Sequence, residues 1–306
     1  MTPPGATPPE ITAAPKTAVR RPVRLVALDV DGTTIDLDQR IHPRTRAAVR
    51  AAVAGGLPVV LATGRMYRSV LPWALDLEVR LPLVCYQGAL VRTLPGEGAQ
   101  VVDGVPQGET LAEDPVDPTV AVRALEVARA GGWHVQAYRG DRLLCDRLRP
   151  EGEAYSRIAQ VEQVLVADLR PIMEAGSTKV VCVVEDEAGA AACETELRSA
   201  LGAGARVVRS LPQFIEVTSP LASKARGVRR VCELLGIEMT EVAAVGDAPN
   251  DIDLLEAAGF AVAVRGAAPE VLRVADAVCG PPQQAGVADV LDRFSGWGFT
   301  GPTPAA

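Results

Sequence analysis

Basic charge, aromatic rings and long apolar segments are all scarce in this sequence of 306 residues. Lys and Arg number 31 against 38 Asp and Glu, which leaves a formal net charge of −7, and Phe, Trp and Tyr make up only 4% of the chain. Nucleic-acid binding needs basic groups that displace counterions and rings on which bases stack, so this composition argues against it. The longest segment without a charged residue, Ala51–Gly64, is interrupted by Gly55, Gly56 and Pro58 and is shorter than the about 20 apolar residues of a spanning helix. We therefore expect neither nucleic acid nor a membrane as a partner.

Patterns typical of zinc sites, disulfides and secretion signals are missing as well. The six cysteines include no Cys-x-x-Cys pair, and His42 and His134 are the only histidines, so buried thiols are favoured over disulfides or zinc ligands. Residues 1–22 contain six prolines and no continuous apolar block, unlike a secretory signal. We expect a disordered tail at 1–22, a second tail at 296–306, and a cytoplasmic protein.

The length and the apolar pattern predict two domains of different character. Short apolar runs alternate with helical patterns at both ends of the chain, as in a parallel sheet with crossover helices. Between them, hairpin-like alternation mixes with helices, which is typical of an α+β unit. We expect a doubly wound, Rossmann-like α/β core made of residues 23–87 and 211–295, with an α+β cap of residues 88–210 inserted into it.

Acidic residues follow two of the predicted core strands. Asp29 and Asp31 come after the strand at 24–28, and Asp247 comes after the strand at 242–245. The carboxyl ends of parallel strands form the crevice where ligands bind, so these carboxylates should meet there. Gly32 permits the sharp turn that keeps backbone away from a bound anion. Like charges gathered at one place need a cation, and carboxylate oxygens next to a phosphate favour Mg²⁺.

Three further motifs strengthen this interpretation, because isolated acids at strand ends are more often solvated turn formers. Thr63 and Gly64 end the second predicted strand, where a hydroxyl and exposed N–H groups can bind phosphate. Lys224, at the start of a predicted helix, is one of only three lysines, which suggests that a compact point charge is needed there; a helix-terminal surface charge is the alternative. Asn250 and Asp251 complete the series after Asp247.

Together, the residues of these four ordered motifs resemble the haloacid dehalogenase superfamily of phosphohydrolases. The segments that carry the resemblance are Asp29-Val30-Asp31-Gly32-Thr33, Thr63-Gly64-Arg65, Lys224, and Gly246-Asp247-Ala248-Pro249-Asn250-Asp251. The large insertion after the third predicted core strand, at residues 83–85, is similar to the cap of the Cof-type branch. The resemblance covers about residues 23–293.

The resemblance implies a phosphatase that works through an aspartyl-phosphate intermediate. In such an enzyme Asp29 is the nucleophile, Asp31 the general acid and base, and Lys224 a charge stabiliser. Asp29, the backbone carbonyl of Asp31, and Asp247 are implied as Mg²⁺ ligands, with Asp251 behind them orienting Lys224 or a metal-bound water. The remaining implied phosphate-binding residues are Thr63, Gly64 and Asn250.

Three departures from the family pattern stand out. The first motif continues Thr33-Thr34 where relatives have Thr-Leu. Relatives commonly have Asn-Gly-Ala where this chain has Gln87-Gly88-Ala89, and they usually have a glycine shortly before the lysine, where this chain reads Pro220-Leu221-Ala222-Ser223, so the placement of the leaving group and the geometry of the phosphate loop stay open. Five polar or aromatic cap residues could meet a sugar or a second phosphate, although packing or solvation is the favoured explanation for each of them: Trp133, His134, Gln136, Tyr138 and Arg139.

We expect the substrate to be a small phosphorylated metabolite such as a sugar phosphate. Two other functions fit the same motifs: a phosphomutase of the same superfamily, and a non-catalytic phospho-switch or binding protein in which a phosphorylated Asp29 signals.

Overall fold

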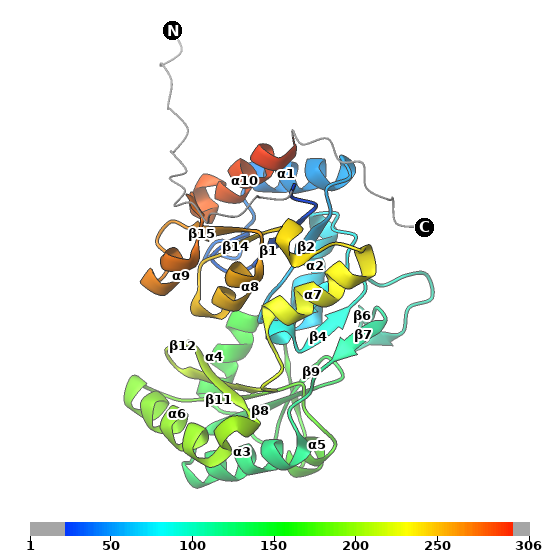
Figure 1. Ribbon diagram of the computed structural model, residues 1–306. Helices are drawn as coiled ribbons and strands as arrows, with labels where there is room; N and C mark the ends of the chain where they lie inside the picture. The colour runs from blue at the N-terminus through cyan, green and yellow to red at the C-terminus, as the bar shows by residue number, and fades with distance from the viewer. Residues whose placement is uncertain (1–21, 296–306) are drawn as a thin grey trace. The chain divides into compact units, whose positions relative to one another are not determined.

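The structure, a computed structural model, describes residues 22–295, so the tails expected at 1–22 and 296–306 lie outside the described residues apart from Pro22. The chain divides into two compact units (Figure 1). The core unit takes the residues up to Thr63, then Trp73–Leu83 and the residues from Ser223 onward. The inserted unit takes Gly64–Pro72 and Val84–Ala222.

The core unit is built on a five-stranded parallel sheet with the order β16-β15-β14-β1-β2. Its strands are β1 (Leu25–Leu28), β2 (Val59–Leu61), β14 (Val242–Gly246), β15 (Phe260–Val264) and β16 (Ala277–Cys279). The central pair, β1 and β14, is in register from Leu25 opposite Val242 to Leu28 opposite Val245. Each strand is short and almost entirely apolar, because a parallel sheet is buried on both faces.

Helices cover both faces of this sheet, as the sequence pattern predicts for a doubly wound fold. They are α1 (Pro43–Ala54), α7 (Lys224–Leu235), α8 (Ile252–Ala257), α9 (Pro269–Val274) and α10 (Gly286–Ser295). Figure 1 shows α1 and α10 together on one face and α7, α8 and α9 on the other. Another helix, α2 (Tyr67–Asp76), runs from the inserted unit into the core unit. The expected fold class, a doubly wound α/β core with an inserted α+β unit, is confirmed.

A six-stranded mixed sheet with the order β10-β9-β8-β11-β13-β12 forms the centre of the inserted unit. Its strands are β8 (His134–Arg139), β9 (Arg142–Cys145), β10 (Gln163–Leu165), β11 (Lys179–Val183), β12 (Arg206–Leu211) and β13 (Phe214–Thr218). The accompanying helices are α3 (Pro118–Ala130), α4 (Pro150–Ala159), α5 (Arg170–Glu174) and α6 (Glu187–Leu201). Residues of α3, α5 and α6 pack on one sheet face in a single apolar cluster.

Smaller sheets complete the inserted unit. One consists of β3 (Leu83–Cys85), β4 (Leu90–Arg92) and β7 (Thr110–Glu113), and the other of β5 (Val101–Val102) and β6 (Val105–Pro106). We expected β3 to be the third strand of the core sheet, but it lies in this three-stranded sheet instead. We also placed residues from 211 onward in the core, whereas β13 pairs antiparallel with β11 and so carries the six-stranded sheet as far as Thr218.

The second face of the six-stranded sheet carries several buried polar side chains, and three of the cap residues singled out in the sequence lie on it. His134, Gln136 and Tyr138 alternate along β8 with apolar cluster residues and are all buried. Lys179 and Glu216 lie on the same face, and both are buried in an ion pair whose Nζ to Oε1 distance is 3.2 Å. The Lys179 ammonium also lies 4.9 Å from the centre of the Tyr138 ring.

The two other cap residues are placed differently. Trp133 packs partly buried against the apolar cluster, and Arg139 is exposed and donates to backbone carbonyls.

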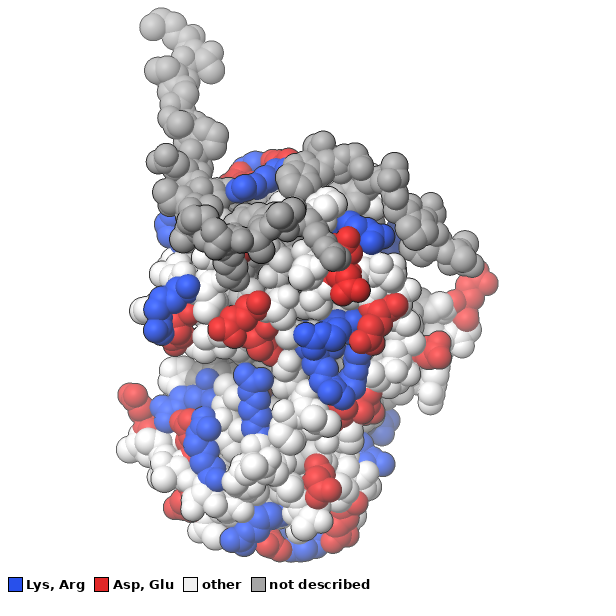
Figure 2. Space-filling view, viewed as in Figure 1, with Lys and Arg blue, Asp and Glu red and all other residues white. Residues whose placement is uncertain are grey.

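The charged surface and the thiols agree with the composition. On the face shown in Figure 2, basic and acidic side chains are interspersed. All six cysteines are free and buried, as the sequence predicts. Between residues 22 and 295, no helix has both the length and the apolar character that crossing a membrane requires.

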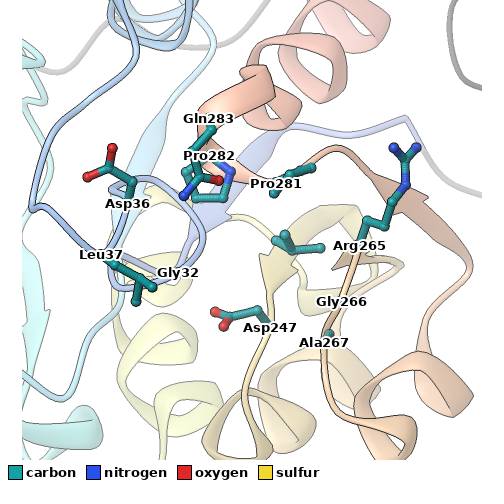
Figure 3. Close-up of a pocket in the computed structure, with 11 residues that line it drawn as sticks. Gly32, Asp36, Leu37, Asp247, Arg265, Gly266, Ala267, Pro281, Pro282 and Gln283 are labelled. Carbon is teal, nitrogen blue, oxygen red and sulfur yellow. The ribbon is translucent and has the colours of Figure 1, made fainter.

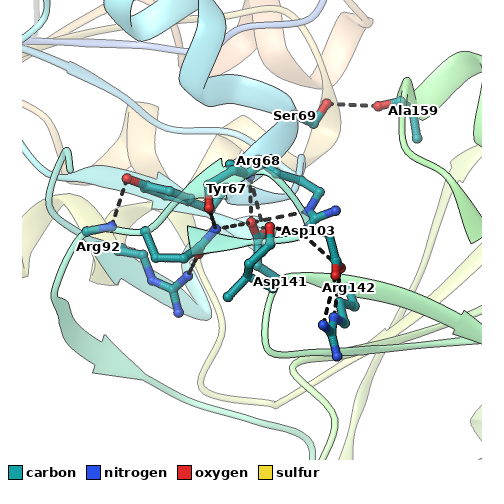
Figure 4. Close-up of polar contacts among 12 residues, drawn as sticks. Tyr67, Arg68, Ser69, Arg92, Asp103, Asp141, Arg142 and Ala159 are labelled. Atoms are coloured by element: carbon teal, nitrogen blue, oxygen red, sulfur yellow. Dashed lines mark hydrogen bonds and ion pairs between the residues drawn. The ribbon is translucent and has the colours of Figure 1, made fainter. Parts of the chain in front are cut away.

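A buried carboxylate in the inserted unit holds the segment that follows Gly64 (Figure 4). Asp141 lies at the turn between β8 and β9, and it accepts hydrogen bonds from Arg68 N at 3.0 Å, from Tyr86 Oη and from Gln107 Nε2. Arg68 is the second residue of α2, so its N–H is one of the helix-terminal donors that have no partner within the helix. Burial raises the pKa of Asp141, while the Arg68 N–H and guanidinium oppose this. Asp141 therefore caps α2 from a distant part of the sequence.

Replacing Asp141 by alanine leaves one buried and two half-buried donors without their acceptor. We expect Asp141→Ala to lower the free energy of unfolding by about 3 kcal/mol, measured by urea denaturation, because unsatisfied buried donors cost about 1–3 kcal/mol each. The control is Asp103→Ala, which also replaces an aspartate of positive φ but removes only the ion pairs of an exposed carboxylate with Arg142 and Arg68, so it should lose much less stability. Equal effects of the two substitutions would contradict a capping role for Asp141.

Candidate active site

The candidate site begins where β1 ends. Asp29 directly follows β1, and its N–H continues the ladder by donating to the Val245 carbonyl of β14 at 3.0 Å. Its own carbonyl accepts a hydrogen bond of 2.6 Å from the Thr34 hydroxyl. Thr34 is not among the predicted site residues, although it departs from the family pattern and places a second hydroxyl after the Asp-x-Asp-Gly motif. Asp29 is buried, and these two hydrogen bonds fix its backbone at the carboxyl edge of the sheet.

A tight turn after Asp29 brings the first and last motifs together. Gly32 has φ of 78°, and a Cβ built on it would lie 2.4 Å from Asp247 Oδ2. No side chain fits here without moving the Asp247 carboxylate. The Thr33 hydroxyl donates to Asp247 Oδ1 at 2.8 Å and fixes that carboxylate from the same turn. Asp31, in this turn, is exposed.

Asp247 and Asp251 follow β14 and are positioned by its exit. Asp251 has no exposed surface, and its Oδ2 accepts from the backbone N–H groups of Asp247 and Ala248, both at 3.1 Å. These contacts fold the segment after β14 back on itself. Gly246 makes this possible, because a Cβ there would lie 2.5 Å from Asp251 Cγ.

Lys224 connects the segment that follows β1 with the segment that follows β14. It is the first residue of α7, whose N-cap Ser223 accepts from Arg226 N. Its Nζ donates to Asp29 Oδ1 at 2.5 Å and to Asp251 Oδ1 at 2.6 Å, and only 1% of its surface is exposed. A compact ammonium suits a space between two carboxylates better than a planar guanidinium.

The glycine that relatives usually carry before this lysine is not needed for the local turn. In this chain the turn that precedes Lys224 is closed by a hydrogen bond of 3.0 Å from Ala222 N to the Ser219 carbonyl.

The electrostatics of the site call for a further cation. Carboxylate oxygens of Asp29, Asp247 and Asp251 lie within 4.8 Å of one another. Burial raises the pKa of Asp29, and so does repulsion from Asp251, while the Lys224 ammonium opposes this rise. Burial also raises the pKa of Asp247, and the hydrogen bond from Thr33 opposes it. When ionised, the three acids exceed the charge of Lys224 by two, which is the charge of one divalent ion.

The donor set fits a hard divalent cation such as Mg²⁺, which prefers carboxylate oxygens and water. Asp251 already accepts hydrogen bonds on both oxygens, so Asp29 and Asp247 are the side chains best placed to hold an ion. The Asp31 side chain is not part of this acidic group, and the assignment of its carbonyl as a ligand stays a prediction.

The remaining residues of the predicted site are placed as follows. Thr63 is buried just after β2 in the core unit, and Asn250 is half-buried in the short turn at Pro249–Asp251. Gly64 belongs to the inserted unit, where a Cβ on it would lie 2.4 Å from Gln87 Nε2. Tyr86 and Gln87 both have positive φ, 51° and 58°, which is uncommon for residues with side chains. This left-handed turn sets the Gln87 amide against Gly64.

Comparisons with known proteins agree with the motif pattern. A family model described as haloacid dehalogenase-like hydrolase matches residues 26–291 of the chain. The chain is 29% identical over 275 residues to the phosphoglycolate phosphatase of Methanothermobacter thermautotrophicus. This alignment covers 90% of this chain and 100% of that protein. It is 26% identical over 277 residues to the HMP-PP phosphatase of Serratia proteamaculans, covering 89% and 95% of the two chains.

Among solved structures, a haloacid dehalogenase-like hydrolase from Bacteroides thetaiotaomicron superposes on this chain with a TM-score of 0.78. The two are 25% identical, and the superposition covers 89% of this chain and 99% of the other. The similarity therefore includes both units, not only the sheet that carries the acids.

The contact between Gly32 and Asp247 generates a direct test of the site. Gly32→Ala should weaken Mg²⁺ binding by about 10- to 100-fold in calorimetry, because it displaces a carboxylate that is well placed to hold the ion. The matched control is Gly56→Ala, whose φ of 87° imposes similar backbone strain but whose Cβ meets no atom within 4 Å. Both variants should lose about 1–2 kcal/mol of stability. If Gly56→Ala weakened ion binding as much, crowding of Asp247 would not be the cause.

Proposed function

The chain belongs to the haloacid dehalogenase-like hydrolase family and is a phosphatase, and from this premise we propose that it is a Mg²⁺-dependent hydrolase of small phosphorylated metabolites. We propose further that the phosphoryl group passes through an aspartyl-phosphate formed on Asp29. The phosphoglycolate phosphatase and HMP-PP phosphatase among its relatives are named for small substrates, which supports a small phosphate ester here.

The observation that carries this proposal is the buried contact of Lys224 with Asp29. One oxygen of the Asp29 carboxylate is held by the ammonium at 2.5 Å, which fixes the orientation of the other oxygen. A carboxylate that is ionised, oriented and shielded from water is a competent nucleophile toward phosphorus. Lys224 in turn is fixed by Asp251, so Asp251 acts as a positioning residue.

The first proposed step transfers the phosphoryl group to the protein. An Asp29 oxygen forms a bond to phosphorus as the bond from phosphorus to the ester oxygen breaks. The leaving oxygen takes a proton from the Asp31 carboxyl group. Asp31 suits this role because its side chain is exposed on the turn that follows Asp29, where a leaving group and a water molecule can reach it.

The second step releases phosphate. Asp31, now ionised, takes a proton from a water molecule as that water attacks phosphorus, and the bond to Asp29 breaks. Inorganic phosphate leaves, and both carboxyl groups return to their starting states.

Charge that develops on the phosphoryl oxygens is the main obstacle in both steps. Lys224 supplies one positive charge, and the Thr63 hydroxyl and the Asn250 amide are assigned as hydrogen-bond donors to the phosphoryl oxygens. A divalent cation held by Asp29, Asp247 and the Asp31 carbonyl would supply the remaining positive charge.

A panel of phosphate monoesters tests the function. Purified protein should release inorganic phosphate from at least one small ester with Mg²⁺ and should lose this activity in excess EDTA. Asp29→Asn should be inactive, whereas Asp38→Asn, which alters an exposed acid outside the acidic group, should retain activity. Hydrolysis that persisted in Asp29→Asn would rule out the aspartyl-phosphate route, and isomerised product without net phosphate release would indicate a mutase.

The two roles of Asp31 make a sharper prediction. Asp31→Asn should slow turnover of a sugar phosphate by about 10²- to 10⁴-fold, because loss of a general acid or base has effects of this size. With p-nitrophenyl phosphate, whose leaving group needs no proton, the first step should survive. Rapid mixing should then show a burst of p-nitrophenolate close to one per protein, followed by slow steady turnover. A slow reaction without a burst would show that formation of the aspartyl-phosphate, and not its hydrolysis, limits turnover in this variant, contrary to the prediction.

A further inference from the structure

One cavity of the core unit reaches the acidic group through Asp247 (Figure 3). It encloses about 170 Å³ between the turn after β1, the end of β14 and the segments that follow β15 and β16. This volume accommodates several water molecules, since one occupies about 30 Å³ in the liquid. Figure 3 shows the Asp247 carboxylate directed into this space.

Asp247 is the acid through which the cavity reaches the site. Asp29 and Asp251 are at most 4% exposed, whereas Asp247 is half-buried and lines the cavity. Among the described residues that line it, neither Asp31 nor Thr63 is found, although these two are assigned to the leaving group and the phosphoryl oxygens. The cavity therefore approaches the acidic group from a direction that the substrate does not need.

The charges of the lining favour cations over phosphate esters. Three charged residues, Asp36, Asp247 and Arg265, are among the lining residues, and their formal charges sum to −1. A cleft of this sign concentrates cations and repels a phosphate dianion. Pro281 and Pro282 form part of the wall and offer no side-chain ligand that would retain an ion before it reaches Asp247.

We propose that this cavity is the port through which the divalent cation and its water molecules reach and leave Asp247, separately from the path of the phosphate ester. The inference rests on the divalent ion of the proposed function. It implies that the ion and the waters around it can exchange while a phosphoryl group occupies the site.

Two substitutions from different segments fill the port. Ala267→Phe and Gln283→Trp each add an aromatic ring to a residue that lines the cavity, and Gln283 is exposed, so its replacement should fold normally. The matched control is Leu272→Trp on α9, which adds similar bulk at an exposed position outside the lining. We expect both port variants to slow Mn²⁺ association and its release into excess chelator by at least about tenfold, measured by stopped flow with a metal indicator.

The equilibrium distinguishes a port from a binding residue. A blocked route slows entry and exit alike, so calorimetry should give the same Mn²⁺ affinity for Ala267→Phe, Gln283→Trp and the wild type within about twofold. If affinity falls while the release rate rises, these residues help to hold the ion and the port is excluded. Unchanged rates in both variants would also exclude it.

A second arm uses inorganic phosphate to occupy the substrate side. With saturating phosphate, Mn²⁺ release from the wild type should continue at a similar rate, and release from the port variants should become slower still. If phosphate alone stops release from the wild type, the ion leaves by the substrate path.

Arg265→Glu gives a test that does not depend on bulk. This change makes the mouth more negative, so Mn²⁺ association should become faster at low salt, and the difference should vanish at high salt.

The outcomes also separate this inference from the proposed function. If the wild type neither binds the ion nor hydrolyses phosphate esters, the proposed function fails; if it does both and the port variants exchange the ion normally, only the port fails.

Discussion

A buried ammonium between two buried carboxylates is the interaction on which the site depends. Lys224 contacts Asp29 at the end of β1 and Asp251 beyond β14, and all three side chains are withdrawn from solvent. Two carboxylates could not be buried side by side without such a partner, because each alone would take up a proton or move to the surface. Lys224 thereby determines the orientation of Asp29 and the path of the chain after β14. The same ammonium is then in place for charge that develops on a phosphoryl group.

Much of the core and of the acidic group follows from the sequence, because both depend on local patterns. Short apolar runs that end in Asp29 and Asp247 mark strands of a parallel sheet, and in such a sheet neighbouring strands bring their carboxyl ends together. The pairing of Leu28 with Val245 places these two acids next to each other. The choice of lysine at 224 in a chain that otherwise favours arginine is a local signal too. The roles given to these residues in catalysis rest on the resemblance and stay proposals.

What the sequence does not reveal depends on contacts between distant segments. The run Phe214–Thr218 is apolar enough for a core strand, yet it pairs antiparallel with β11, because an apolar run does not specify which sheet it joins. The prediction that Leu83–Cys85 is a strand of the core sheet is wrong for the same reason. Helix α4 was not predicted, because Gly152 weakens its helical pattern. In the structure the lack of a side chain at Gly152 allows the close approach of His134. The capping of α2 by Asp141 joins residues 73 positions apart, so no local sequence motif predicts it.

The placement of lysine and cysteine has a practical consequence for covalent labelling. Between residues 22 and 295, Lys179 and Lys224 are the lysines, both buried against carboxylates, and all six thiols are buried as well. Amine-directed and thiol-directed reagents thus find almost no target on the folded surface of this part of the chain. Their rate of reaction there reports how often the protein opens, so each of the two units carries its own built-in probes of local unfolding.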